Sequence, residues 1–287
     1  MRILLIANGF HSKNFNALTM YNIELTTIHN TNLDSINLNN FDVIYSPASP
    51  IDVSRYPSTK FIFGPHFSVF PDKNQMDLIS GNKNVIYIQP SEWAKNVWLN
   101  NPICKNIRFE PLPFGVDTIK FNEIKPIDER NNVFVYFKRR QPEELAVVNN
   151  FLHNFGIKAR IFNYVERYDE NDYINYLHNS KFGIWLDAHE SQGFALEEAL
   201  SCNVPLFVWN VVSMKQEYGS SYDNIPATTI PYWDERCGES FINKDELYDT
   251  FKKFINNLNN YKPRDYILEN LSIDICNKKF IELVNKI

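Results

Sequence analysis

The chain has 287 residues, of which 44% are hydrophobic and 22% charged, so it is long enough for two domains and too apolar to be disordered. Its formal net charge of −5 argues against a broad nucleic-acid-binding surface. The 4 cysteines form no C-x-x-C pair, so neither a zinc site nor a redox dithiol is indicated, and reduced cysteines fit a cytoplasmic protein. The apolar run at residues 3–7 is too short for a signal peptide, and no run approaches the roughly 18 residues of a transmembrane segment.

Short apolar runs in the first half predict the strands of a parallel sheet that is buried on both faces. These runs lie at 3–7, 23–28, 41–45, 60–63, 84–88 and 107–110. Ser91 is expected to cap a helix over 92–99. The polar segment 119–132, which contains Pro126, is expected to link two domains.

Strands and helices alternate again from residue 133. Strands are expected at 133–137, 158–162, 182–186 and 205–209, and helices at 143–155, 172–178 and 194–201. The stretch 245–287 is expected to form two helices broken at Pro263. This pattern predicts an α/β fold with two Rossmann-like domains whose parallel sheets face a cleft, over 1–120 and 121–265, followed by a C-terminal helix over 266–287.

The segment around Glu190 is the most informative part of the sequence. A strand is expected to end at Leu186, Glu190 falls in a short loop, and Gly193 lets the backbone approach a ligand before a helix begins at Phe194. The free N–H groups and positive end of that helix suit a diphosphate. Glu198 follows about one turn into the helix, and carboxylates accept hydrogen bonds from sugar hydroxyls. The segment therefore predicts a site for a nucleoside diphosphate sugar.

These residues resemble the E-x7-E signature of the retaining GT-B glycosyltransferases, known as family 4 or group 1. The resemblance implies that Glu190 contacts the donor sugar and Glu198 the ribose, with the backbone near Gly193 and Phe194 facing the sugar and diphosphate. The continuation is similar to the family's "EA-small-x-G-x-P" pattern, with Asn203 where the family has Gly, and Asn tolerates the positive φ of a helix C-cap. Residues 114–118 are similar to the family's "NGVD" segment, whereas the first 110 residues are only weakly similar.

The alternative is that the acidic residues of this helix only complement its dipole. Helical phase leaves Glu197 and Glu198 near the two edges of the core-facing side and does not choose between them. The family pattern selects Glu198.

Three cations, Lys138, Arg139 and Arg140, directly follow the first strand of the second domain. Cations at the carboxyl end of a strand can stabilise a leaving diphosphate. If the strand continues, Lys138 and Arg140 share a face and Arg139 points elsewhere. The family that the chain resembles has an Arg and a Lys about five positions apart at this place. The sequence therefore does not show which of the three cations contacts phosphate. The alternative is that all three are solvated surface charges.

Further candidates for the site are Gly9, His66 and Tyr164. Gly9 follows the opening strand, where the resemblance places a glycine loop near the donor phosphates and the acceptor. His66 follows the strand at 60–63 and has a pKa suited to a catalytic base, although the resembling enzymes use the leaving diphosphate as base, so His66 is equally a positioning residue. Tyr164 is a candidate to stack on the nucleobase, with a core aromatic as the alternative.

Several motifs are absent from the sequence. There is no G-x-G-x-x-G, no P-loop, no second His of an H-E-x-x-H and no D-x-D metal anchor. We therefore expect neither a bound cofactor nor a required metal.

Together these features predict a hexosyl- or pentosyltransferase that moves a sugar from a nucleoside diphosphate sugar to a glycan or other hydroxyl acceptor, with retention and without metal. The resemblance implies that the second domain binds the donor through Glu190, Glu198, Lys138 and Arg140, that the first binds the acceptor, and that the last helix packs back across both. The alternatives are an inactive GT-B-like binding or scaffold subunit, a nucleotide-sugar epimerase and a phosphorylase. The sequence specifies neither nucleobase, sugar, acceptor, linkage nor oligomeric state.

Overall fold

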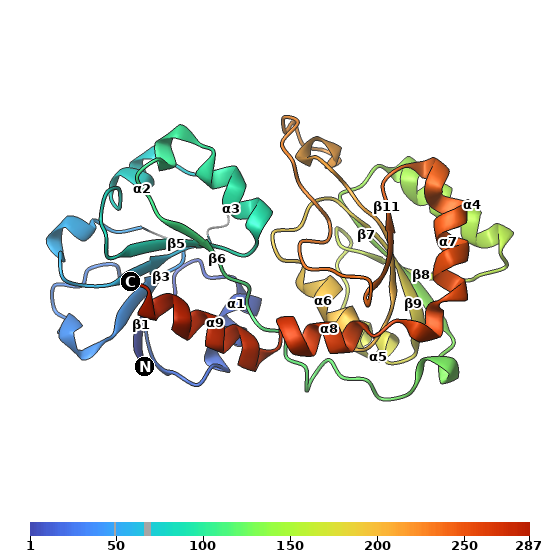
Figure 1. The fold of residues 1–287 in the computed structure, drawn as a ribbon, viewed down its shortest axis with the longest axis horizontal. Coiled ribbons are helices and arrows are strands. Elements are labelled where there is room, and N and C mark those ends of the chain that lie inside the picture. Colours follow the sequence, from blue (N-terminus) through green and yellow to red (C-terminus); the bar gives the residue numbers. More distant parts are fainter. Residues whose placement is uncertain (49, 66–69) are drawn as a thin grey trace. The chain divides into compact units, whose positions relative to one another are not determined.

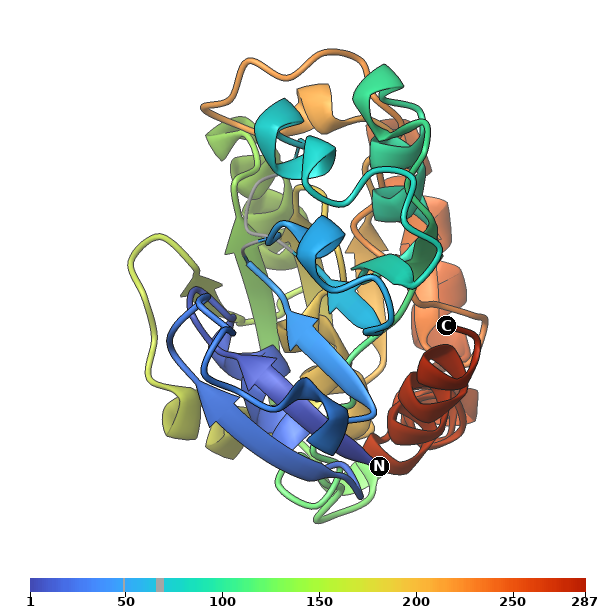
Figure 2. The ribbon, with the colours of Figure 1, turned by 90° about the vertical axis from the view of Figure 1, so that its left-hand side faces the viewer.

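The computed structural model describes residues 1–48, 50–65 and 70–287, which form two units (Figure 1). Unit 1 comprises Met1–Gly115 together with Ile273–Ile287, and unit 2 comprises Val116–Ser272. The boundaries thus fall at 115/116 and 272/273, where 120/121 and 265/266 were expected. Both chain termini lie in unit 1 (Figures 1 and 2).

Unit 1 contains a parallel sheet with the strand order β2-β1-β3-β4-β5-β6. Its strands are β1 (Arg2–Ile6), β2 (Glu24–Ile28), β3 (Val43–Ser46), β4 (Phe61–Phe63), β5 (Val85–Gln89) and β6 (Phe109–Pro111). Its helices are α1 (Ser12–Thr19), α2 (Lys73–Asp77), α3 (Glu92–Leu99) and α9 (Ile273–Asn285). The strand predictions for this half are confirmed. Strands β1, β3, β4 and β5 are buried on both faces, as their apolar runs predict, whereas β2 at the edge of the sheet is mostly exposed.

Helix α9 joins unit 1 although it comes from the far end of the sequence. The ring of Phe280, which is 0% exposed, lies 5.9 Å from the ring of Tyr21 and 6.0 Å from that of Tyr45. Figure 2 shows α9, in red, near the N-terminus of the chain. The C-terminal helix therefore completes the core of unit 1.

Unit 2 contains a second parallel sheet, with the order β11-β10-β9-β7-β8. Its strands are β7 (Asn132–Lys138), β8 (Arg160–Asn163), β9 (Ser180–Asp187), β10 (Leu206–Trp209) and β11 (Gly238–Phe241). Its helices are α4 (Pro142–Asn154), α5 (Glu170–Leu177), α6 (Phe194–Ser201), α7 (Leu247–Asn256) and α8 (Pro263–Asn270). Strand β11 was not predicted, because its sequence, GESF, has no apolar run.

Two expectations about connecting segments need correction. The C-terminal stretch forms three helices, α7 to α9, because Pro263 begins α8 and a further break follows at Leu271 and Ser272. The segment 119–132 is not a free linker: the Arg130 side chain, 0% exposed, donates to the carbonyl oxygens of Ser180 and Cys202 at 3.3 and 3.0 Å. That guanidinium fixes the segment to unit 2.

The strand order of unit 2 defines where a ligand is expected. In the sheet, β7 lies between β8 and β9. The chain runs from β7 to β8 on one side and then crosses to β9 on the other side, so the connections change direction between β7 and β9. Open α/β sheets bind ligands at the carboxyl ends of the strands beside such a switch point. Lys138 and Asp187, the last residues of β7 and β9, are register partners there.

Among the described residues, no helix is both long and apolar enough to cross a membrane.

Candidate functional site

Lys138 is the centre of a polar cluster at the end of β7. Its Nζ forms an ion pair with Glu190 Oε1, lies 3.9 Å from Asp187 Oδ2, and is 4.7 Å from the ring centre of Tyr164. The side chains of Lys138 and Glu190 are 17% and 16% exposed, so the pair is accessible from solvent. The structure therefore brings together Lys138, the last residue of β7, with Tyr164 and Glu190, which follow β8 and β9.

Glu198 and Asp187 are both close enough to Tyr168 to affect its pKa. Burial raises the pKa of Tyr168 to about 12, and the nearby carboxylates of Glu198 and Asp187 add to the rise. The Tyr168 hydroxyl also shares a hydrogen bond with that of Tyr136. Glu198 is 4% exposed, so its carboxylate is buried.

Glu197 has other neighbours. It is 0% exposed and accepts a hydrogen bond from Gln192 Nε2 at 3.0 Å. Its carboxylate contributes to raising the pKa of Tyr266 on α8, where burial is the main cause. The two adjacent glutamates of α6 therefore have different neighbours, and Glu198 is the one that lies, with Asp187, close to Tyr168.

Helix α6 begins directly beside Glu190. Gly193 precedes it with φ 94° and ψ 50°, a left-handed conformation that favours glycine. A Cβ there would lie 3.5 Å from Glu190 Cβ, so conformation rather than space requires the glycine. Phe194 is the first helical residue and is partly exposed. The first N–H groups of α6, which the side-chain-less Gly193 does not cap, thus lie next to the Glu190 loop.

Two titratable groups of this loop are shifted toward their neutral forms. Burial raises the pKa of Asp187 to about 6, against the opposing effect of Lys138. Burial lowers the pKa of His189 to about 4, and Lys138 and Arg139 lower it further. His189 Nδ1 lies 3.4 Å from Glu217 Oε2, and at neutral pH the imidazole there carries no charge.

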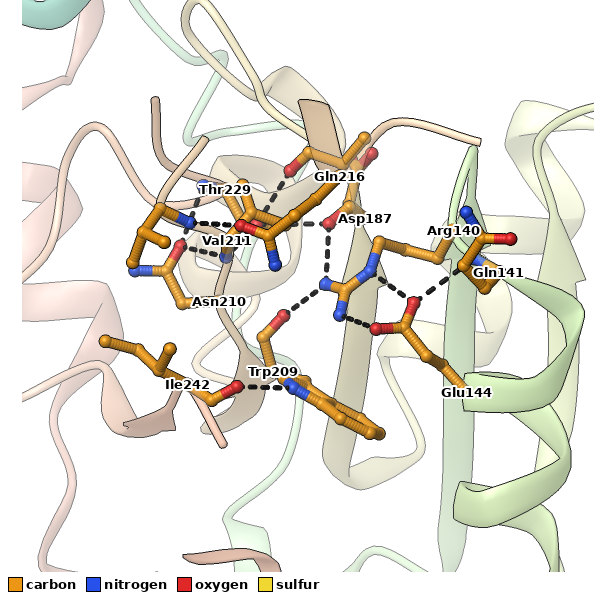
Figure 3. Close-up of polar contacts among 12 residues, drawn as sticks. Arg140, Gln141, Glu144, Asp187, Trp209, Asn210, Val211, Gln216, Thr229 and Ile242 are labelled. Carbon is orange, nitrogen blue, oxygen red and sulfur yellow. Dashed lines mark hydrogen bonds and ion pairs between the residues drawn. The ribbon is translucent and has the colours of Figure 1, made fainter. Parts of the chain in front are cut away.

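Arg140 occupies a different environment from Lys138. Arg139 has φ 51°, which turns the chain after β7, so the strand geometry that would place Lys138 and Arg140 on one face ends. The Arg140 side chain is 0% exposed and holds Glu144 through Nε and Nη2 at 2.7 and 2.6 Å. Its Nη1 donates to the carbonyl oxygens of Asp187 and Trp209 at 3.2 and 2.6 Å (Figure 3). Arg140 therefore ties α4 to the ends of β9 and β10.

The connection after β10 fixes the Glu190 loop from the other side. Asn210 Oδ1 accepts from the backbone N–H groups of Val211 and Thr229 at 2.9 and 2.8 Å (Figure 3). Thr229 Oγ1 donates to the carbonyl oxygen of Ala188 at 2.7 Å, and the Glu190 N–H donates to that of Thr228 at 3.0 Å. These bonds position the backbone on both sides of His189.

The remaining predicted residues belong to unit 1. Gly9 follows β1 with φ 65° and is exposed. His66 lies outside the described residues. In the portions of the chain that are described, no group of at least 3 His, Cys, Asp or Glu side chains is arranged to hold a metal ion.

Asp187, Tyr168 and Glu217 belong to this neighbourhood and were not predicted. Asp187 directly follows an apolar strand, so its place at a strand end was a signal in the sequence. Glu217 is 8% exposed and pairs with Arg139 Nη1 at 3.1 Å, but it and Tyr168 lie in loops without a periodic pattern. Only the folded chain shows that they meet the strand ends.

The chain is similar to solved structures of glycosyltransferases. Sucrose-phosphate synthase from Thermosynechococcus elongatus matches 86% of this chain and 74% of its own, with 10% identity and a TM-score of 0.53. WaaG, a glycosyltransferase involved in lipopolysaccharide biosynthesis, matches 99% of both chains, with 9% identity and a TM-score of 0.50. No family model matches the chain, and no curated protein does. The chain therefore has the GT-B glycosyltransferase fold.

A fold of this kind does not define an activity by itself. The N-terminal domain of trehalose-6-phosphate phosphatase from Candida albicans matches 92% of this chain and 83% of its own, with 10% identity and a TM-score of 0.50. Any argument about function therefore depends on the residues of the site.

Proposed function

We propose that the chain is a glycosyltransferase that moves a sugar from a nucleoside diphosphate sugar to a glycan or other hydroxyl acceptor. The observation that carries this proposal is the gathering of Lys138, Glu190 and Glu198 at the switch point between β7 and β9, beside the start of α6. A cation and a helix N-terminus suit the diphosphate, and two carboxylates suit the hydroxyls on either side of it. The GT-B fold supports the same reading.

In this proposal the donor replaces Glu190 as the partner of Lys138. The Lys138 ammonium and the first N–H groups of α6 bind the diphosphate, Glu190 accepts from a sugar hydroxyl, and Glu198 accepts from the ribose. Tyr164, 46% exposed and beside Lys138, is placed to stack on the nucleobase. Arg140 then acts as a positioning residue, because its guanidinium is buried against Glu144 and two carbonyl groups.

The proposed reaction retains the anomeric configuration and needs no metal. The bond between the sugar's anomeric carbon and the diphosphate breaks, a bond to the acceptor oxygen forms on the same face, and the acceptor proton passes to a diphosphate oxygen. The Lys138 ammonium and the helix N–H groups stabilise the charge that develops on the leaving group. Unit 1, with Gly9 at the end of β1, would bind the acceptor.

Thermal unfolding with a panel of UDP-, GDP-, ADP- and CMP-sugars in EDTA tests the proposal. A ligand at 100 times its dissociation constant adds about 2.7 kcal/mol of stability. One nucleoside diphosphate sugar should stabilise the wild type and stabilise Lys138→Ala much less, whereas Lys158→Ala, an exposed lysine before β8, should respond like wild type. A panel in which nothing stabilises the protein, or in which stabilisation requires a divalent metal, contradicts the proposal.

Product analysis with the stabilising donor distinguishes the alternative activities. Transfer to an added glycan or alcohol, or slow release of the sugar to water, supports a transferase. Conversion of the donor to a different nucleotide sugar without any acceptor indicates an epimerase, and binding without turnover indicates an inactive subunit.

We also propose a cytoplasmic location, because the 4 cysteines, which all lie in the described part of the chain, are buried and form no disulfide there. Fractionation of cells that express the chain checks this, and recovery in an oxidising compartment contradicts it.

A further inference from the structure

The start of α3 in unit 1 carries buried polar atoms without a partner. Gln89 ends β5 and is 4% exposed, and Ser91 directly precedes α3 and is 1% exposed. Neither Gln89 Nε2 nor Ser91 Oγ has a hydrogen-bond partner among the residues that the structure describes. Unpaired buried polar groups cost free energy, so two of them at one place require an explanation.

Ser91 occupies the capping position of α3 but does not act as a cap. Its backbone is extended, with φ −149° and ψ 167°, and its side chain makes no capping hydrogen bond. The corresponding residue of α2 does cap its helix, since Asp72 Oδ1 accepts from the Gln75 N–H at 3.1 Å. The Ser91 hydroxyl is therefore a donor that the helix itself does not use.

Gln89 lies on the side of the sheet that α3 covers. It alternates along β5 with Tyr87, whose ring stacks on that of Trp98 of α3 at 4.9 Å between centres. Alternate residues of a strand share a face, so the Gln89 amide belongs to the α3 layer, at the end where α3 begins. This end is also the carboxyl edge of the sheet, where open α/β folds bind ligands.

The charge at this place favours an anion. The N-terminus of a helix carries roughly half a positive charge. The charged side chains of the first turn, Glu92 and Lys95, pair with each other at 2.5 Å and add no net charge. Hydroxyl and amide N–H donors beside a helix N-terminus match an oxyanion, which only accepts hydrogen bonds.

We propose that Ser91, Gln89 and the first turn of α3 bind a terminal oxyanion, phosphate or carboxylate, of the acceptor molecule. The acceptor role rests on the proposed glycosyltransferase function, whereas binding of the anion does not. The proposed enzyme would then prefer acceptors that carry an acidic group near the hydroxyl that reacts.

Titration of the full chain, labelled with ¹⁵N-tryptophan, tests this site directly. Trp93 lies in the first turn of α3, so its backbone N–H reports on the site, whereas Trp185 on β9 reports on unit 2. Inorganic phosphate and acetate are titrated separately. One of them should shift the Trp93 signal saturably, with a dissociation constant that rises about tenfold or more in Ser91→Ala and in Gln89→Leu. The exposed serine variant Ser54→Ala should bind as the wild type does.

Two results would overturn the anion site: no saturable shift of Trp93 with either anion, or a shift that is unchanged in both variants. Unchanged signals from the other tryptophans confirm that a variant is folded. If Gln89→Leu does not fold, Ser91→Ala alone tests the site. Failure of the donor proposal is visible separately, as the absence of any Trp185 response to nucleotide sugars. In that case the result contradicts only the acceptor role of the site, and binding of the anion is still supported.

Discussion

Lys138 and Arg140 are close in sequence but differ in what their charges can reach. The Lys138 side chain is 17% exposed and pairs with Glu190, whose side chain is 16% exposed, whereas the Arg140 side chain is 0% exposed. A ligand can exchange with Glu190 at Lys138, but it cannot displace Glu144 and two backbone carbonyls from Arg140. The first residue therefore suits binding, and the second suits the positioning of the loop.

This difference predicts that two alanine variants lose stability by different amounts. Arg140→Ala should lower the free energy of unfolding by about 3 kcal/mol, because it leaves Glu144 and two carbonyl groups without their donor. Lys138→Ala should cost clearly less, since the partly exposed Glu190 can turn toward water, but it should weaken donor binding. Urea denaturation of both variants measures the ranking, and a larger loss in Lys138→Ala contradicts the assignment.

The buried groups around Lys138 predict two opposing dependences of stability on pH. The pKa of Asp187 rises from 3.8 to about 6, so the folded chain binds the proton more tightly, and stability from this group is lost as pH rises from about 4 to 6. The pKa of His189 falls from 6.5 to about 4, so stability is lost as pH falls through that window. Each shift corresponds to about 3 kcal/mol at roughly 1.4 kcal/mol per pKa unit.

Single variants separate the two contributions. As the pH rises from 4 to 7, the stability of Asp187→Asn should increase relative to that of wild type. As the pH falls from 7 to 4, any loss of stability in His189→Gln relative to wild type should become smaller. Urea denaturation at both pH values measures this, and parallel pH profiles for wild type and both variants would show that neither group titrates as described.

At the scale of elements, the residue after helix α6, Asn203, links this helix to its neighbours in unit 2. Asn203, predicted to adopt a positive φ, has φ 57°. Its side chain also donates to Glu123 Oε1 at 3.0 Å and accepts from the Arg264 N–H at 3.3 Å. The residue thus serves both the backbone turn and the contacts between α6, α8 and the segment before β7.

Substitution of Asn203 separates these two roles. Asn203→Ala should be less stable than Asn203→Gly by about 1–2 kcal/mol, because both lose the side-chain contacts but only glycine adopts the left-handed conformation without strain. Thermal unfolding of the pair measures the difference. Equal stabilities would mean that the turn relaxes to a negative φ.

The elements that could be predicted from the sequence are those whose burial leaves a pattern. The central strands β7 and β9 are buried on both faces and appear as apolar runs, and Gly193 marks the start of α6. Strand β11 has no such run and was missed. Helical phase did not separate Glu197 from Glu198, because the helix is buried on both edges and each glutamate is distinguished only by its neighbours, Gln192 and Tyr168.

At the scale of the whole molecule, the chain returns to its first unit through α9. Phe280 is 0% exposed within unit 1, so Phe280→Ala should destabilise that unit by about 3–5 kcal/mol. Amide hydrogen exchange is measured on peptides from each unit. The increase in exchange rate from wild type to Phe280→Ala should be larger in unit 1 than in unit 2. Leu268→Ala, at a position 40% exposed in unit 2, is the control, and uniform loss of protection in Phe280→Ala would contradict a local role of α9.

The division into units could be predicted only approximately, because it depends on contacts made across the sequence. The ends of unit 2 lie at Val116 and Ser272, which form a β-bridge with each other. Polar composition and Pro126 placed the expected boundary later, since composition does not show that Arg130 anchors the segment to β9. Pairing between distant residues, rather than local pattern, sets these limits.

The central claim, that the cluster at the end of β7 binds a nucleotide sugar, is tested most directly by calorimetric titration of two neighbouring variants. Glu198→Gln and Glu197→Gln make the same conservative change in adjacent buried residues of α6, of which Glu198 lies near Tyr168 and Glu197 accepts from Gln192. We predict that Glu198→Gln weakens binding of the stabilising nucleotide sugar about tenfold or more, while Glu197→Gln binds within about twofold of wild type. Equal affinities in the two variants, or a larger loss in Glu197→Gln, would contradict the proposed donor site.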